Sequence, residues 1–249
     1  MYLKKSLSTL LLMLLCATTA QAREWGLHFE KNSNEPMVDA PAEELATLDA
    51  YYRDLSGDMV LYLTFDAGYE AGYTEGMIDT LNRHKAHGTF FLTASYIKNN
   101  PDIVRRMVAE GHTVANHTVS HPNMSQLSRE QFAQELLGVE EIFHDLTEIQ
   151  LPKYFRPPQG AYHERSLALA KELGYKTIFW SLAYMDFDKD NQPSHHTAYK
   201  KLVPPIHPGA IILLHNMSRT NAEILDGLLT QYTQLGYTFE SLERFIRHY

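Results

Sequence analysis

The sequence predicts an α/β fold in which a parallel sheet lies inside a layer of helices. Short apolar runs alternate with longer stretches of helical period, which gives about six β–α units in roughly 190 residues. Several of the apolar runs are continuous, which is typical of strands buried on both faces. A (β/α) barrel and an open doubly wound sheet both fit this pattern. No G-x-G-x-x-G follows the first strand, so the pattern disfavours a dinucleotide-binding sheet.

The predicted strands are short and rich in β-branched and aromatic residues. In chain order they cover residues 59–66, 88–94, 112–117, 153–158, 176–183 and 210–216. Helices are predicted over residues 73–85, 101–111, 128–146, 163–174 and 219–236. Ser128, three residues before Gln131, predicts a capping box at a helix start. Glycines are expected as C-terminal caps at Gly111, Gly174 and Gly236.

The first 22 residues have the pattern of a secretory signal peptide. Lys4 and Lys5 precede an apolar stretch over 7–17, and Ala20-Gln21-Ala22 forms an A-x-A cleavage site. The apolar stretch is shorter than the roughly 20 residues that cross a bilayer. We therefore expect cleavage after Ala22, a secreted, periplasmic or cell-wall location, and no stable membrane insertion. An uncleaved membrane anchor is the alternative.

Residues 23–57 are mostly polar and are predicted to form an N-terminal extension that packs on a core domain over 58–249. One helical pattern runs over 42–55 within this extension. Its apolar residues recur at i, i+3, i+7 and i+10, namely Leu45, Leu48, Tyr52 and Leu55.

Composition excludes several kinds of site. Cys16 is the only cysteine and lies in the predicted signal peptide, so disulfides, thiolate metal sites and a cysteine nucleophile are excluded from the mature chain. Removal of Lys4 and Lys5 leaves 20 basic residues against 30 acidic ones, a formal charge of −10. Such a surface repels phosphate backbones, so we expect no nucleic-acid partner.

Polar side chains stand at or near the ends of five predicted strands. They are Asp66 after the first, His117 after the third, Arg156 late in the fourth, Asp186 just past the fifth and His215 at the end of the sixth. The carboxyl ends of the strands of a β/α barrel converge on one mouth, where chemistry is done. We therefore expect these five residues to share one site.

Residue types indicate what each could do there. Asp66 suits a general base or a metal ligand, and the alternative is a turn cap. His117 and His121 are four residues apart in HTVSH, so a tight turn can bring both imidazoles to one divalent ion. Arg156 suits an ion pair that keeps Asp66 ionised, with a plain surface arginine as the alternative.

His215 and the loop after Arg156 add an acid and an oxyanion site. A histidine delivered by the most apolar strand suits a general acid near neutral pH, and Asp186 can hold it protonated. Alone, Asp186 is more typical of a solvated loop residue. The backbone amides of Gln159 and Gly160 follow two prolines and can face a developing oxyanion.

Five ordered motifs over residues 64–215 resemble those of the polysaccharide deacetylases with a NodB-homology domain, carbohydrate esterase family 4: TFDAG, HTVSH, RPPQG, WSLAYMDF and LLH. The resemblance implies a distorted (β/α) barrel of about seven parallel strands with outer helices, and metal-assisted removal of acetyl groups from amino sugars. The chain is similar in particular to the muramic-acid de-N-acetylases of peptidoglycan δ-lactam formation, through LTFDAGYEAGYTE, NHTVSHP, FWSLAYMDFD and Trp25-Gly26.

The resemblance also implies roles in proton transfer. Asp66 corresponds to the catalytic base, and Arg156 to the arginine that orients this base. His215 corresponds to the catalytic acid, and Asp186 to the carboxylate that tunes this acid.

Other positions correspond to the metal and substrate contacts of the family. His117 and His121 match the two histidines that bind a divalent metal, for which zinc is the expected ion. The Gln159 amide lines the oxyanion site, and Leu213 belongs to the apolar wall around the acetyl methyl group.

Three positions depart from the family pattern. Ala67 stands where a second aspartate usually ligates the metal, so only two histidines remain and affinity should fall; the muramic subgroup is similar in lacking this aspartate. Ala183 replaces an aspartate that often opens the fourth motif. Phe187 replaces a Trp or Tyr and lacks a polar handle for sugar. Like Trp180, it is more typical of a core than of a sugar platform, but an aromatic side chain near this mouth can serve as both, so both residues are candidate substrate contacts.

We therefore expect a monomeric hydrolase that removes acetyl groups from N-acetylmuramic acid in peptidoglycan glycan strands. A non-catalytic glycan-binding module is one alternative, because Ala67 removes a metal ligand. A deacetylase of chitin oligomers or of acetyl-xylan on the same scaffold is the other.

Overall fold

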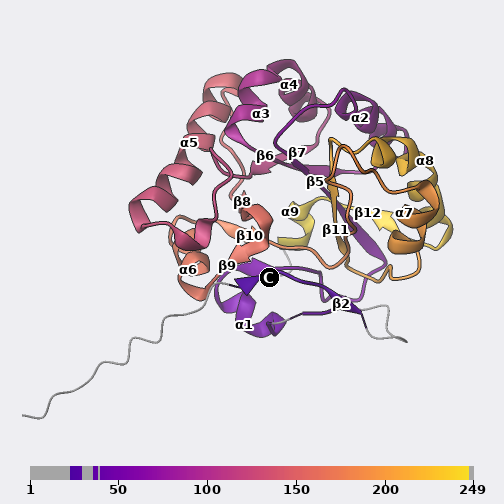
Figure 1. Cartoon of the computed structure of the whole chain (residues 1–249), viewed down its shortest axis with the longest axis horizontal. Coiled ribbons are helices and arrows are strands. Elements are labelled where there is room, and N and C mark those ends of the chain that lie inside the picture. Colours follow the sequence, from indigo (N-terminus) through magenta and orange to yellow (C-terminus); the bar gives the residue numbers. More distant parts are fainter. Residues whose placement is uncertain (1–22, 30–35, 39, 247–249) are drawn as a thin grey trace, which may run out of the picture.

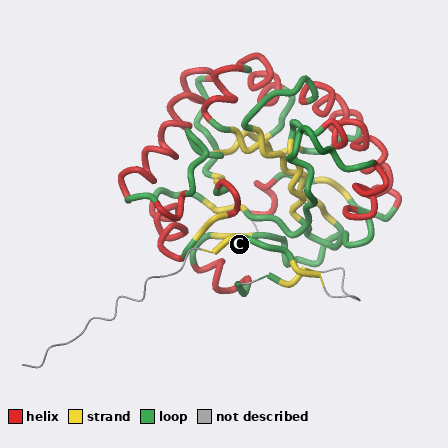
Figure 2. The backbone as a smooth tube through the Cα atoms, in the orientation of Figure 1, coloured by secondary structure: helices red, strands yellow, loops and turns green. Residues whose placement is uncertain are grey.

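The computed structural model describes residues 23–29, 36–38 and 40–246, and the predicted signal peptide over 1–22 lies outside these residues. Helices surround a curled sheet, whose strands form the inner layer (Figures 1 and 2). In the described part of the chain, no helix is long and apolar enough to span a membrane.

The main sheet has eight strands within the described residues, and all of its strand pairs are parallel. Their bounds are β4 Ala50–Tyr51, β5 Val60–Ala67, β6 Gly88–Leu92, β7 Thr113–Asn116, β8 Tyr154–Phe155, β10 Lys176–Ile178, β11 Ile211–His215 and β12 Thr238–Phe239. Seven strands follow the order β11-β5-β6-β7-β8-β10-β4, and β12 pairs with β5 off this path.

The sheet winds in one direction and then closes on itself. Consecutive strands are neighbours from β5 to β10, and β11 returns to pair with β5. Leu182, beyond β10, forms a parallel bridge with Ile212 of β11, and the amide of Leu213 donates to the Leu182 carbonyl oxygen at 2.9 Å. A doubly wound sheet would reverse direction, so the structure confirms the distorted barrel. All the carboxyl strand ends consequently meet at one mouth.

The helices lie outside the barrel except α9 (Leu242–Ile246), which appears inside the ring of strands (Figure 1) and packs Leu242 and Phe245 with buried residues of β5, β6, β7 and β11. Their bounds are α1 Ala42–Thr47, α2 Thr74–Arg83, α3 Ala94–Asn99, α4 Pro101–Ala109, α5 Arg129–Thr147, α6 Glu164–Glu172, α7 His195–Leu202, α8 Arg219–Gln234 and α9 Leu242–Ile246, with 3₁₀ turns at Met124–Gln126 and Pro158–Gly160. The predicted helices correspond to α2, α4, α5, α6 and α8. Helices α3, α7 and α9 were not predicted, because they have only six, eight and five residues and show too few periods of the pattern.

Helix ends follow the predicted capping signals. The Ser128 side chain accepts from the Gln131 amide and the Gln131 side chain accepts from the Ser128 amide, so the capping box of α5 is confirmed. The glycines after α4, α6 and α8 have φ of +84°, +81° and +91°, at Gly111, Gly174 and Gly236. A left-handed residue at this position closes a helix, as expected.

The helix predicted over 42–55 is wrong beyond Thr47, where α1 ends. Asp49 has a left-handed backbone, with φ of +50°, and turns the chain into β4. The amides of Thr177 and Phe179 then donate to the carbonyl oxygens of Asp49 and Tyr51, at 2.8 and 2.7 Å. These sheet bonds replace the helical ones, so part of the predicted extension forms a strand of the main sheet beside β10.

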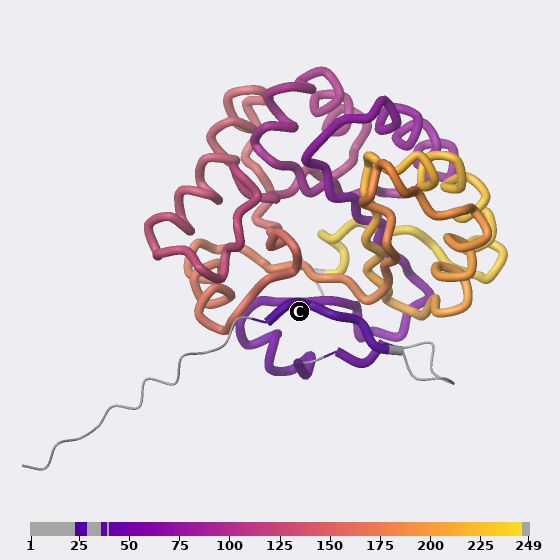
Figure 3. Tube along the Cα trace, in the orientation of Figure 1, coloured from indigo at the N-terminus to yellow at the C-terminus, as the bar shows by residue number. Residues whose placement is uncertain are grey.

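Two short antiparallel pairs complete the N-terminal region. Strand β1, Arg23–Glu24, pairs with β9, Ala161–Tyr162, and strand β2, His28–Phe29, pairs with β3, Pro36–Met37. The chain trace shows the indigo N-terminal segment beside the orange part of the chain that carries β9 (Figure 3).

Candidate active site

A cavity of about 610 Å³ opens at the barrel mouth. Eight of the ten predicted site residues line it, namely Asp66, His117, His121, Gln159, Trp180, Phe187, Leu213 and His215. The other two, Arg156 and Asp186, are buried behind the lining, with 0% and 1% of their surface exposed. The structure thus brings all ten residues to one place.

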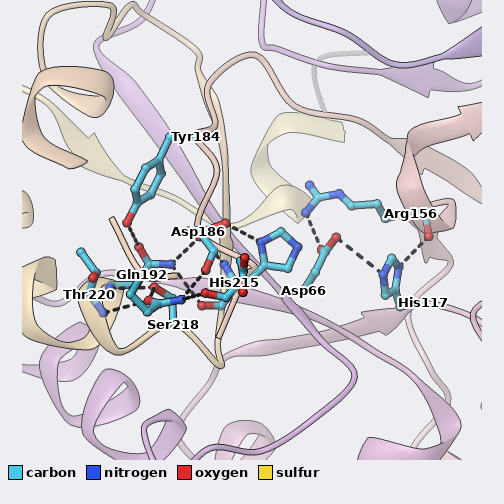
Figure 4. Close-up of polar contacts among 11 residues, drawn as sticks. Asp66, His117, Arg156, Tyr184, Asp186, Gln192, His215, Ser218 and Thr220 are labelled. Carbon is cyan, nitrogen blue, oxygen red and sulfur yellow. Dashed lines mark hydrogen bonds and ion pairs between the residues drawn. The ribbon is translucent and has the colours of Figure 1, made fainter. Parts of the chain in front are cut away.

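Asp66 is the penultimate residue of β5, and Arg156 follows directly after β8. The Arg156 Nη1 donates to Asp66 Oδ1 at 2.8 Å (Figure 4). Its Nε and Nη2 donate to the carbonyl oxygens of Ile178 and Phe179, at 2.9 and 3.2 Å, which fixes the guanidinium in the barrel wall. Burial alone would raise the pKa of Asp66, but the Arg156 charge and the neighbouring imidazoles hold it below its usual value. Asp66 is therefore an ionised carboxylate at neutral pH.

His117 follows β7 and presents an unprotonated nitrogen to Asp66. Its Nδ1 lies 2.9 Å from the Arg156 carbonyl oxygen, which can only accept, so this nitrogen carries the ring proton (Figure 4). The Nε2 lies 3.6 Å from Asp66 Oδ2. Burial lowers the pKa of His117 to about 4, and burial also lowers the pKa of His121. Both imidazoles are neutral near pH 7, as a metal ligand must be.

A strained turn places the two imidazoles together. Thr118 and His121 have left-handed backbones, with φ of +73° and +57°, which is rare for a β-branched residue such as Thr118. Thr118 Oγ1 accepts from the His121 amide at 3.0 Å, and the Thr118 amide donates to Asn116 Oδ1 at 2.9 Å. The rings of His117 and His121 meet edge-on, with centroids 4.9 Å apart. Such strain is typical of functional sites.

His215 ends β11, directly beside Asp66 in the sheet register. Its Nδ1 lies 2.7 Å from Asp186 Oδ1, and its amide donates to Asp186 Oδ2 at 2.9 Å (Figure 4). Burial alone would lower the pKa of His215, but the charge and hydrogen bond of Asp186 and the charge of Asp66 raise it above the usual value. His215 is thereby prepared to hold a proton.

The residues that hold Asp186 could not be identified from the sequence. The Asn221 side chain, from α8, donates to Asp186 Oδ2 at 2.5 Å and to the His215 carbonyl oxygen at 3.1 Å. Gln192 Nε2 donates to the Asp186 carbonyl oxygen at 3.0 Å, while its Oε1 accepts from Ser218 Oγ at 2.6 Å. Polar residues in a loop and on a helix are common, so only the fold reveals that these meet the dyad.

The turn Pro158–Gly160, which we call the oxyanion turn after its predicted role, lines the cavity through Gln159 and Gly160. Gln159 and Gly160 both have left-handed backbones, with φ of +60° and +64°. The Gly160 amide donates to the Pro157 carbonyl oxygen at 3.0 Å, so it is occupied, contrary to the expectation that it faces an oxyanion. The Gln159 amide remains the candidate donor of this turn.

Aromatic side chains flank the cavity. Phe187 is 52% exposed and meets the His215 ring edge-on at 5.7 Å, so its position fits the predicted substrate contact and not the alternative of a core residue. Trp180 is half-buried in the wall. Tyr69 was not predicted, yet it lines the cavity with 61% of its surface exposed. Its place three residues after Asp66, just past a strand end, was the available signal.

His117 and His121 fit a divalent ion that other ligands must complete. The His117 Nδ1–H bond to a carbonyl is the usual support for a ligating Nε2. Across residues 23–29, 36–38 and 40–246, no group of three or more His, Cys, Asp or Glu side chains is placed to hold a metal. Ala67 is fully buried in an apolar cluster and supplies no donor. We therefore expect weaker binding than a site with three protein ligands gives.

Comparisons with known proteins agree with this geometry. A family model described as polysaccharide deacetylase matches residues 54–178. The peptidoglycan-N-acetylmuramic acid deacetylase PdaA of Bacillus subtilis is 39% identical over 93% of this chain and 91% of its own. An uncharacterized 30.6 kDa protein of Geobacillus stearothermophilus is 45% identical over 88% of this chain and 83% of its own.

A solved structure extends the likeness to the fold. The structure of B. subtilis PdaA, described as a family 4 carbohydrate esterase, has a TM-score of 0.87 and 38% identity to this chain. It covers 92% of this chain and 98% of that one. Shared sequence, a shared barrel and a family match that includes Asp66, His117, His121 and Arg156 lead to one conclusion: the chain belongs to the polysaccharide deacetylase family.

Proposed function

We propose that the protein hydrolyses the N-acetyl group of amino sugars in peptidoglycan, with N-acetylmuramic acid as the preferred residue. The observation that carries the proposal is the pairing of an ionised Asp66 with a proton-holding His215 on adjacent strands at one cavity. Two groups with opposite proton preference are what hydrolysis of an amide requires. The preference for the muramic residue is supported by the similarity to PdaA.

Asp66 and His215 carry out separate proton transfers. Asp66 takes a proton from the attacking water while Arg156 keeps the carboxylate in place. The water oxygen bonds to the acetyl carbon, and the carbonyl oxygen becomes an oxyanion that the Gln159 amide can receive. His215 gives its proton to the sugar nitrogen as the C–N bond breaks. Acetic acid and a free amine leave, the acid loses its proton to solvent to become acetate, and the proton on Asp66 is returned to His215 through solvent.

The remaining groups orient the substrate. Leu213 offers an apolar wall to the acetyl methyl group, and Phe187 and Trp180 offer aromatic faces to the sugar. A divalent ion held by His117 and His121, with zinc as our expectation, supplies polarisation of the acetyl carbonyl and of the water. On a muramic residue stripped of its peptide, the freed amine can close on the lactyl carboxyl to give a δ-lactam. We further propose that the mature chain acts as a monomer outside the cytoplasm, after cleavage at Ala22.

The test is mass spectrometry of peptidoglycan fragments after incubation with the purified mature chain. We expect loss of one acetyl group from muramic residues and release of acetate. Asp66→Asn keeps the shape of the side chain but removes the base, so acetate release should fall by roughly 10²–10⁴-fold. Undiminished release by this variant would refute the assigned base.

A non-catalytic glycan-binding module is the second candidate, and the loss of a metal ligand at Ala67 favours it. A binder would retain peptidoglycan in a pull-down but release no acetate at any concentration of added zinc. A deacetylase of chitin oligomers or acetyl-xylan would instead release acetate faster from those glycans than from peptide-stripped peptidoglycan. The same acetate assay thus separates all three functions.

A further inference from the structure

The first described residues of the chain run along the back of the oxyanion turn. Strand β1 pairs with β9, which follows this turn directly. The Trp25 amide then donates to the Gly160 carbonyl oxygen at 3.0 Å. A segment next to the predicted cleavage site is thereby bonded to the turn that carries Gln159, more than a hundred residues away in sequence (Figure 3).

The Trp25 side chain contacts Trp180, which lines the same cavity as Gln159. It is 6% exposed, and its Nε1 donates to the Trp180 carbonyl oxygen at 2.9 Å. Its ring stacks on Phe179 with centroids 4.4 Å apart and planes 17° from parallel. The Phe179 carbonyl oxygen in turn accepts from Arg156. Trp25 therefore joins two parts of the site: its backbone amide bonds to the turn, and its indole contacts the segment whose carbonyl oxygens hold Arg156.

Gly160 is tightly packed against Trp25 and Trp180. A Cβ added to Gly160 would lie 2.9 Å from the Trp25 Cβ and 2.9 Å from the Trp180 ring, and such distances do not occur between packed atoms. The turn therefore rests directly on Trp25. Gln159 has a left-handed backbone that persists only where the surroundings fix it. Trp25 supplies this support in two ways: its amide and Cβ contact Gly160, and its indole holds Trp180, whose ring also packs against Gly160.

We infer that Trp25 is a positioning residue for the reaction, and that the N-terminal segment Arg23–Trp25 is part of the active-site wall. This inference rests on the proposed function, because its purpose is to hold the Gln159 amide where the oxyanion forms. Cleavage after Ala22 would leave β1 intact at the start of the mature chain. Support of the turn that carries Gln159 would therefore account for a tryptophan just after the predicted cleavage site.

The test compares Trp25→Ala, Trp25→Phe and Leu45→Ala in the full mature chain. Leu45, on α1, belongs to the same apolar cluster as Trp25, and its side chain has no polar atom to bond to either wall. Leu45→Ala is therefore the matched control for Trp25→Ala, because it truncates a side chain of the same cluster without removing a hydrogen bond. Activity is measured at a temperature where circular dichroism shows every variant fully folded.

We expect Trp25→Ala to lower kcat roughly 10–100-fold with KM within about twofold of wild type, because a misplaced oxyanion donor acts on the transition state. Trp25→Phe keeps the ring packing and loses only the Nε1 bond, so its kcat should fall less. Leu45→Ala should lower Tm and leave kcat unchanged. Added indole should fill the cavity of Trp25→Ala and restore part of its kcat.

Hydrogen–deuterium exchange of peptides over residues 157–162 gives a readout that does not need activity. Exchange should be faster in Trp25→Ala than in Leu45→Ala and wild type. Equal exchange, or an unchanged kcat in folded Trp25→Ala, would overturn the inference. A wild-type chain that releases no acetate would instead refute the proposed function, and the exchange comparison would still decide whether Trp25 holds the turn.

Discussion

Asp66 and His215 face the same cavity, but the residues behind them prepare them for opposite tasks. Arg156 is a permanent cation and lowers the pKa of Asp66, whereas Asp186 is an anion and raises the pKa of His215. Both partners are fully buried, so solvent screens these pairs weakly. Neighbouring charges thus shift the two pKa values in opposite directions, which fits the proposed roles of Asp66 as base and His215 as acid.

Asp186→Asn tests whether the charge of Asp186 raises the pKa of His215. The raised pKa of His215 keeps it protonated, so activity should persist as pH rises and then fall as pH passes that pKa. Removing the Asp186 charge lets burial dominate and lowers the pKa of His215, so the alkaline limb of the kcat profile should move to lower pH. At pH 8 we expect kcat to fall at least about tenfold, which is the effect of one pKa unit.

Asp188→Asn is the matched control, because Asp188 lies in the same loop and its side chain accepts from the amides of Asp190 and Asn191 instead. It loses the same charge without loss of a bond to His215, so its alkaline limb should stay in place. An equal shift in both variants would mean that general loop charge, and not the Asp186 contact, sets the pKa of His215.

At the scale of the element, strand ends were predictable and turns were not. Apolar runs ending at Asp66 and His215 indicated which residues the strands deliver, since the carboxyl ends of a barrel meet. The left-handed turn at Thr118 was not predictable, because local propensity opposes it and tertiary bonds impose it. The same holds for β4, where pairing with β10 overrides the helical pattern around Tyr52.

Glu70 illustrates how one side chain fixes an active-site loop. Its Oε1 accepts from the amides of Gly72 and Tyr73 at 2.6 and 3.0 Å, and its Oε2 accepts from the Tyr96 hydroxyl at 2.6 Å. Burial alone would raise the pKa of Glu70, but hydrogen bonds from the Thr74 and Tyr96 side chains and from the Gly72 and Thr74 amides lower it. The carboxylate thereby holds the loop between β5 and α2.

Glu70→Gln should lower the free energy of unfolding at pH 7 by about 1–3 kcal/mol, since bonds to a charged acceptor are lost. A lowered pKa in the folded state stabilises the fold above the usual glutamate pKa, and this stabilisation is lost as pH falls through the folded-state pKa. The difference from wild type should therefore shrink in urea unfolding as pH falls below about 4.

Ser128→Ala provides the contrast. It removes the cap of α5 and should cost about 1 kcal/mol. Serine does not titrate, so this loss should keep much the same size across that pH range. If the cost of Glu70→Gln were equally independent of pH, ionisation of Glu70 would not be the source of its contribution.

At the scale of the whole molecule, the winding of the barrel brings distant segments of the chain to one mouth. The one-way winding of the sheet explains why five residues from distant segments could be assigned to one mouth from sequence alone. Asn221, Gln192 and Tyr69 could not be assigned to the site from the sequence. They lie on α8 and on loops, and no sequence motif there indicates what these residues contact. The sequence thus predicts the chemistry of the site more fully than its supports.

The chain would carry a formal charge of −10 after the expected cleavage at Ala22, which removes Lys4 and Lys5. Glycan strands stripped of peptide carry lactyl carboxylates, and no Lys or Arg is among the described residues that line the cavity. Repulsion should therefore slow binding at low salt. Between about 10 and 150 mM salt the Debye length falls from about 30 to 8 Å, so kcat/KM for this substrate should rise severalfold.

A neutral chitin oligomer is the matched control for this measurement, because it carries no charge for the protein to repel. If the oligomer is deacetylated at all, its kcat/KM should change little over the same range of salt. A fall in kcat/KM for the anionic strands would contradict the prediction, since it would require a cationic subsite that attracts the lactyl carboxylate. The sign of the salt effect therefore reports whether the muramic residue is selected by attraction at the cavity or by the fit of its uncharged parts against Leu213, Trp180 and Phe187.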